Sequence, residues 1–112
     1  MDQQIININD TQIISGIEIM AVGEGGSHTR KLWVSVPPFA SRPCITVNIY
    51  VAEDSPDPDT TFAPWAIEYI PKGAPGGLDL IGISTANTKN GIPYPLDDTQ
   101  VVCSYLAVGE HI

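Results

Sequence analysis

Acidic residues form the densest cluster of ionisable side chains in this sequence. The stretch EDSPDPD, at residues 53–59, holds four carboxylates within seven residues. Oxygen-rich loops of this kind can hold calcium, but the spacing matches no EF-hand loop, and the two prolines favour a solvated turn. We therefore expect no metal and no cofactor, and keep a calcium site at Asp54, Asp57 and Asp59 as an alternative.

Nucleophilic catalysis would need a base beside a nucleophile, and the sequence offers imidazole only at His28 and His111. His28 follows the turn GEGGS and His111 follows the last predicted strand, so we expect exposed polar residues and no enzyme. The spacing of Cys44 and Cys103 fits no zinc or redox motif. We expect two reduced, mostly buried thiols that pack as small hydrophobic groups.

Sugar binding generally combines an aromatic face with hydrogen-bonding groups around it. Trp33, Asn48 and Tyr50 point outward on predicted strands, and Arg42 lies in the corner between those strands. Our candidate ligand-binding residues are therefore Trp33, Arg42, Asn48 and Tyr50. An outward tryptophan on a strand also fits a subunit interface, so this alternative stays open.

The charge balance narrows the classes of partner. A net charge of −8, with only five Lys and Arg, disfavours nucleic acid and anionic membrane surfaces. No apolar run approaches the roughly 20 residues of a membrane-spanning helix. The start, MDQQIININDTQ, lacks the positive region and apolar core of a secretory signal, so we expect a soluble protein made in the cytoplasm.

Strict alternation of apolar and polar residues predicts strands at residues 31–36 and 44–51. β-Branched and aromatic residues predict four more, at residues 12–22, 65–70, 78–85 and 100–108. Clusters of Gly, Pro, Asn and Asp separate them, as turns do, and one contains the hairpin dipeptide Asn90-Gly91. We expect an all-β fold, a six- to seven-stranded antiparallel sandwich, over residues 11–112. Residues 1–10 form an N-terminal arm or a short strand.

A corner of three prolines joins the two clearest strands, in the stretch VSVPPFASRPCITVNIYV at residues 34–51. Proline cannot donate to a sheet ladder and keeps the preceding residue extended. Pro37, Pro38 and Pro43 should therefore end one strand and start the next. We expect the corner to cross the edge of the sandwich, with Phe39 packed inward.

This corner resembles the "F…PF…P.V" signature of H-type lectin domains and of related C-terminal receptor-binding modules in phage tail fibres. The segment VVCSYLAVGEHI is similar to the last strand of those modules, in which an aromatic residue precedes "AxG", here Tyr105, Ala107 and Gly109. The resemblance implies an H-type lectin-like sandwich, commonly a homotrimer, that grips carbohydrate. No segment of residues 62–90 matches the family's sugar-contacting stretch, so no binding residue is carried over.

Three classes of function remain. The first is a non-enzymatic receptor- or carbohydrate-binding module of a phage tail fibre or similar surface appendage, located on the virion tail and binding a host-surface glycan as a homotrimer. The second is a structural virion protein, a capsid decoration or tail accessory subunit, without a small ligand. The third is a small enzyme or a calcium-dependent binding domain.

Overall fold

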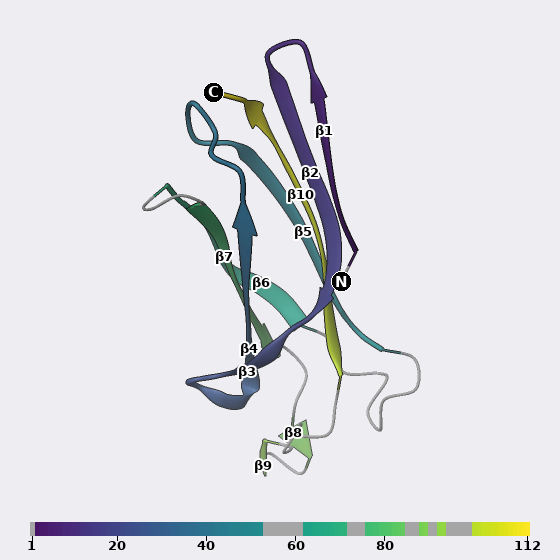
Figure 1. Cartoon of the computed structure of the whole chain (residues 1–112). Helices are drawn as coiled ribbons and strands as arrows, with labels where there is room; N and C mark the ends of the chain where they lie inside the picture. Colours follow the sequence, from purple (N-terminus) through teal and green to yellow (C-terminus); the bar gives the residue numbers. More distant parts are fainter. Residues whose placement is uncertain (1, 53–61, 72–75, 85–87, 90–91, 94–99) are drawn as a thin grey trace.

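The protein is an all-β sandwich, as the sequence predicts. A computed structural model describes residues 2–52, 62–71, 76–84, 88–89, 92–93 and 100–112. Eight of its strands form two antiparallel four-stranded sheets, and two more form a small hairpin (Figure 1). No helix that could cross a membrane is found in this described part of the chain.

The first sheet, called sheet A, contains the first and the last strand of the chain. In spatial order its strands are β1 (Asp2–Ile8), β2 (Thr11–Ile19), β10 (Val101–Glu110) and β5 (Cys44–Val51). β1 pairs with β2 along its whole length, so the opening residues include a strand. Asn9 has a φ of 53° in the turn between them, a left-handed conformation that asparagine tolerates better than most residues.

The second sheet, called sheet B, faces sheet A across the core. In spatial order its strands are β3 (Ala21–Gly23), β4 (Gly26–Val36), β7 (Gly76–Ser84) and β6 (Phe62–Ile70). The hairpin is formed by β8 (Thr88–Lys89) and β9 (Ile92–Pro93), on either side of the Asn-Gly dipeptide that predicts it.

The structure has more strands than the expected six or seven. Residues 12–22, predicted as one strand, pass from sheet A to sheet B at Met20. The Met20 side chain is buried, and its backbone N–H donates to the carbonyl of Val101 at 2.8 Å, which holds the crossing. Strand β1 and the hairpin account for the remaining difference.

The proline corner carries the chain from one sheet to the other, as predicted. Strand β4 ends at Val36 in sheet B, and β5 begins at Cys44 in sheet A. Phe39 is buried, and its ring meets the ring of Tyr69 edge-on with centroids 5.5 Å apart. Its N–H donates to the Tyr69 hydroxyl at 3.0 Å. Phe39 is thus the inward anchor of the corner.

The corner also packs on the end of β10. The N–H of Ala40 donates to the carbonyl of Glu110 at 2.7 Å. A Cβ at Gly109 would lie 2.8 Å from the Phe39 ring and 3.1 Å from Pro43. Glycine is therefore required at this position, because the corner occupies the space that a side chain would need.

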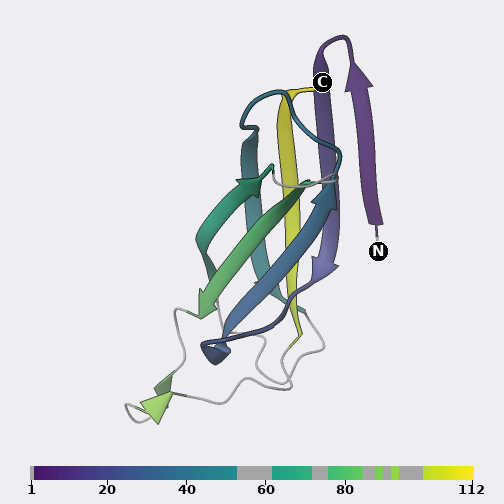
Figure 2. The same ribbon diagram turned by 60° about the vertical axis from the view of Figure 1, so that its left-hand side comes forward.

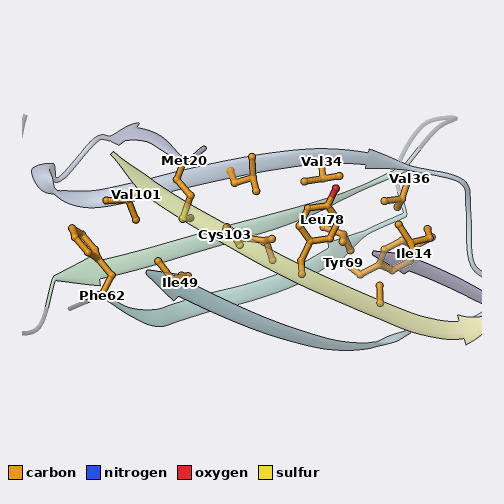
Figure 3. Packing of buried hydrophobic residues seen from close by; sticks show 14 of the residues in the cluster. Ile14, Met20, Val34, Val36, Ile49, Phe62, Tyr69, Leu78, Val101 and Cys103 are labelled. Atoms are coloured by element: carbon orange, nitrogen blue, oxygen red, sulfur yellow. The ribbon is translucent and has the colours of Figure 1, made fainter. Parts of the chain in front are cut away.

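The core fills the space between the two sheets (Figure 3). Leu32, Val34 and Val36 point inward on β4, which confirms the predicted alternation. Each large aliphatic side chain buried in this way stabilises the fold by roughly 1.5–3 kcal/mol. The buried apolar residues are Ile14, Met20, Leu32, Val34, Val36, Phe39, Ile49, Phe62, Tyr69, Leu78, Leu80, Val101, Cys103, Tyr105 and Ala107.

The two cysteines lie on opposite faces of sheet A. Cys103 is buried on the inner face, whereas Cys44 is exposed, so the expectation of two mostly buried thiols is wrong for Cys44. Cys44 starts β5, and the alternation of that strand turns it outward. Burial raises the pKa of the Cys103 thiol to about 11, and the nearby charge of Glu18 adds to this effect.

Candidate functional site

The structure divides the four predicted ligand-binding residues among three places. Trp33 lies on the outer face of sheet B, and Asn48 and Tyr50 lie on the outer face of sheet A. Arg42 lies in the proline corner. Because the two outer faces of a sandwich point in opposite directions, Trp33 cannot share a small ligand with Asn48 or Tyr50. Only Asn48 and Tyr50 are brought together.

Trp33 is half-exposed and lies along the sheet. A Cβ at Gly77 of β7 would clash with the six-membered ring of Trp33, so the ring covers the glycine backbone. Trp33 is 52% exposed, which leaves one side of the indole open to solvent.

The alternative metal ligands Asp54, Asp57 and Asp59 lie outside the described residues.

A groove of about 310 Å³ on the outer face of sheet B is the strongest candidate site. Its volume falls at the lower end of the roughly 300–1,000 Å³ found for ligand pockets. The groove is lined by Glu24, Gly25, Thr29, Lys31, Trp65, Ile81 and Ile83. Trp33, two residues beyond Lys31 on the same face of β4, lies outside it.

The pairing of β4 with β7 builds the floor and one wall of the groove. Thr29 pairs with Ile83, and Lys31 pairs with Ile81, so the four side chains stand on one face. The two half-buried isoleucines form an apolar floor. The turn between β3 and β4 adds Glu24, whose Oε1 lies 4.0 Å from Nζ of Lys31.

A β-bulge builds the opposite wall. The pairing of β6 with β7 shifts between Pro64 and Ala66, which leaves Trp65 without a partner opposite it. Pro64 cannot donate to the ladder, and an extra residue in a strand re-aims the side chains around it. Trp65 is 68% exposed as a result, the most exposed aromatic side chain in the described part of the molecule.

The groove thus combines an aromatic wall, an apolar floor and a polar wall that carries both charges. This arrangement suits a ligand with one apolar face and hydroxyl or amide groups at its edge. Among the described residues, no three His, Cys, Asp or Glu side chains gather closely enough to hold a metal ion.

Sequence reasoning missed Trp65 and Glu24 as site residues. The sequence contains a signal for each residue. For Trp65, a proline directly before an aromatic residue in a strand indicates an edge strand or a bulge. The Gly-rich turn around Glu24 indicates a hairpin that can fold over its own sheet. Neither signal says that the two residues meet at one groove, because that depends on which strands lie between them.

A second hollow, of about 330 Å³, lies at the proline corner. It is lined by Phe39, Ala40, Ser41, Arg42, Tyr69 and Pro71. This is where Arg42 lies, at the other end of β6 from Trp65. The Tyr69 hydroxyl accepts the N–H of Phe39, and Arg42 is an exposed cation on the loop. The groove at Trp65 is therefore the stronger candidate for a binding site.

Comparison of this chain with protein-family models, with curated proteins and with solved structures finds no match. The class of this protein is therefore defined by its own fold and groove. It is a two-sheet antiparallel β-sandwich with a shallow, aromatic-walled groove on one outer face.

Proposed function

We propose that the protein is a non-enzymatic carbohydrate- or receptor-binding module and that the groove beside Trp65 is its binding site. The observation that carries this proposal is the outward indole of Trp65, facing the Lys31–Glu24 pair across an apolar floor. A sugar ring has a C–H face that can stack on an indole and hydroxyl groups around its edge. Lys31, Glu24 and Thr29 supply donors and acceptors for those hydroxyls.

The proposed setting follows the resemblance to phage tail-fibre modules. In it the protein is a homotrimer on a virion tail or similar surface appendage, and the ligand is a host-surface glycan. A shallow groove of this volume buries little of a ligand, so each site would bind weakly. Three equivalent grooves in one symmetric assembly would strengthen attachment through avidity.

The test is a glycan array probed with the wild-type protein and with two tryptophan variants. We expect a positive glycan whose binding falls at least about tenfold with Trp65→Ala, equal to about 1.4 kcal/mol. Trp33→Ala is the matched control, because it removes an exposed indole from the same face of sheet B outside the groove. Loss with Trp33→Ala and retention with Trp65→Ala would move the site to Trp33.

The second candidate function is a structural virion protein without a small ligand. One different observation favours it, namely the exposed apolar side chains on the outer face of sheet A. Assembly proteins need broad apolar contact surfaces of this kind. Absence of binding across the glycan array, together with binding to a virion scaffold, would favour this function over carbohydrate recognition.

A further inference from the structure

The outer face of sheet A is apolar where the outer wall of an antiparallel sandwich is normally polar. Pairing places the outward side chains of β1, β2, β10 and β5 in rows across this face. Six large apolar side chains on it are 40–57% exposed: Ile6, Ile8, Ile17, Ile19, Tyr50 and Leu106. The half-buried Ile13, Val102 and Val108 lie between them.

This face also lacks charge, in a chain that is strongly acidic. None of the five Lys and Arg residues lies in any strand of sheet A. Among the described side chains of sheet A, the one acidic residue at an outer position is Glu110, where β10 ends, and the sequence of β1 starts with Asp2. The rest of the face is uncharged, although the whole chain carries a net charge of −8.

Strand β1 extends this surface beyond the cover of the second sheet. Figure 2 shows β1 beside β2 at the margin of sheet A, outside the width that sheet B covers. Ile5 pairs with the buried Ile14 on the inner side, yet Ile5 is 46% exposed. β1 has no proline, lysine or bulge, the features that normally protect an edge strand. Its free edge is therefore open to another strand or surface.

We propose that the outer face of sheet A, together with β1, is the surface on which a second copy of this chain packs. Two copies with a charge of −8 each repel one another, so they approach at least cost through a face without charge. A partner recognised through complementary charge would need charged groups here, which the face does not offer. Uncharged apolar surface can pack on uncharged apolar surface of a second copy, either face to face about a two-fold axis or side by side in a closed ring, and this favours a second copy as the occupant.

The size of the face is sufficient for a stable contact. Four strands of about eight residues present roughly 500 Å² in flat projection, from a strand spacing of about 4.8 Å and a rise of about 3.3 Å per residue. The side chains that project from the sheet, and the uncovered sides of β1, add to this area. The total approaches the roughly 800 Å² per partner that standard interfaces bury.

This surface and the groove at Trp65 lie on opposite outer faces of the sandwich. A second copy packed on sheet A leaves the groove on sheet B open to its ligand. The groove and the packing surface therefore rest on separate residues, so loss of one leaves the other intact. The packing surface deepens the homotrimer of the proposed function, and a monomeric mass would remove that trimer without removing the groove, which the glycan array tests separately.

The test is the mass of the protein in solution, measured by light scattering behind a sizing column over a wide range of concentration. We expect the wild type at a whole-number multiple of 12.0 kDa that is two or more. Ile17→Glu should reduce the mass to 12.0 kDa, because it places a negative charge on β2, one of the two inner strands of the face. Val22→Glu, on β3 of sheet B, is the matched control, since both side chains are 51% exposed. It should keep the wild-type mass.

Ile6→Glu on β1 is a second variant and should also reduce the mass. Circular dichroism checks that each variant keeps its strand content, which we expect because all three positions are exposed. A wild-type mass of 12.0 kDa at every concentration would overturn the proposal and leave the face to a different partner. It would also be overturned if both folded variants, Ile17→Glu and Ile6→Glu, kept the wild-type mass.

Discussion

The ring of Tyr105 on β10 lies across Gly16 on β2. A Cβ at Gly16 would clash with the phenol oxygen and ring of Tyr105, so no side chain fits beneath the ring. The Tyr105 hydroxyl accepts a hydrogen bond from Nε2 of Gln3 on β1 at 3.1 Å. One buried tyrosine thus connects three neighbouring strands on the inner side of sheet A.

Gly16→Ala should destabilise the protein by about 1–3 kcal/mol, the usual cost of overpacking a core. The measurement is the free energy of unfolding in urea. Tyr105→Leu removes the ring that occupies the space, so Gly16→Ala should cost much less in that background. An equal cost in both backgrounds would show that the ring is not the obstacle.

The two thiols should differ strongly in reactivity. Cys44 is exposed and should be alkylated readily in the folded protein, whereas Cys103 is buried with its pKa raised to about 11. Since the thiolate is the nucleophile, Cys103 should react only when the chain unfolds. Mass spectrometry of the Cys44→Ser variant, alkylated with and without denaturant, measures this directly. Ready labelling of native Cys44→Ser would contradict the buried position of Cys103.

Glu18 is a charged residue whose removal should stabilise the fold. Its Oε2 is buried and has no hydrogen-bond partner among the described residues, and the residue pairs with Cys103 on β10. Glu18→Gln keeps the shape and removes the charge, so stability should rise by about 1 kcal/mol. The pKa of Cys103 should also fall, because the Glu18 charge contributes to raising it. Urea unfolding measures the first effect, and a titration of the thiolate absorbance of folded Cys44→Ser protein, in which Cys103 is the remaining thiol, measures the second. A loss of stability would show that the carboxylate has a partner.

His111 should stabilise the fold more in acid than in base. Its Nε2 lies 2.7 Å from the carbonyl of Asn9 and its Nδ1 lies 2.9 Å from the carbonyl of Ile112. Carbonyl oxygens only accept, so the ring can donate to both only as the imidazolium. The bonds to Ile112 and Asn9, and then the charges of Asp10 and Glu110, raise the pKa of His111 above 6.5.

Because the folded pKa is raised, the His111 contribution is complete below pH 6.5 and is lost as the pH rises through the folded value. The difference in unfolding free energy between wild type and His111→Gln should therefore be larger near pH 5 than near pH 8. An NMR titration of the imidazole measures the pKa itself. A value at or below 6.5 would mean that the two carbonyl contacts do not hold the charged ring.

Local sequence was sufficient to predict several features of the fold. Period-two alternation identifies the inward side chains of β4, such as Leu32 and Val34, because successive residues of a strand point to opposite sides. The three prolines predict the end of β4 and the start of β5, since proline cannot continue a ladder. Those rules act within a strand and its neighbours in sequence.

The tertiary structure decided where the outward side chains meet. Alternation says that Trp33 and Tyr50 point outward, but it does not say that they belong to different sheets and face away from each other. It also does not bring Trp65 opposite Lys31, which depends on β7 lying between β4 and β6 and on a shift in pairing at Pro64. A candidate site on this sandwich is therefore a property of strand order and register. The sequence determined six strand segments and the inner faces of those that alternate, because these follow from local geometry, whereas the crossing at Met20 and the pairing of distant strands depend on packing the whole core.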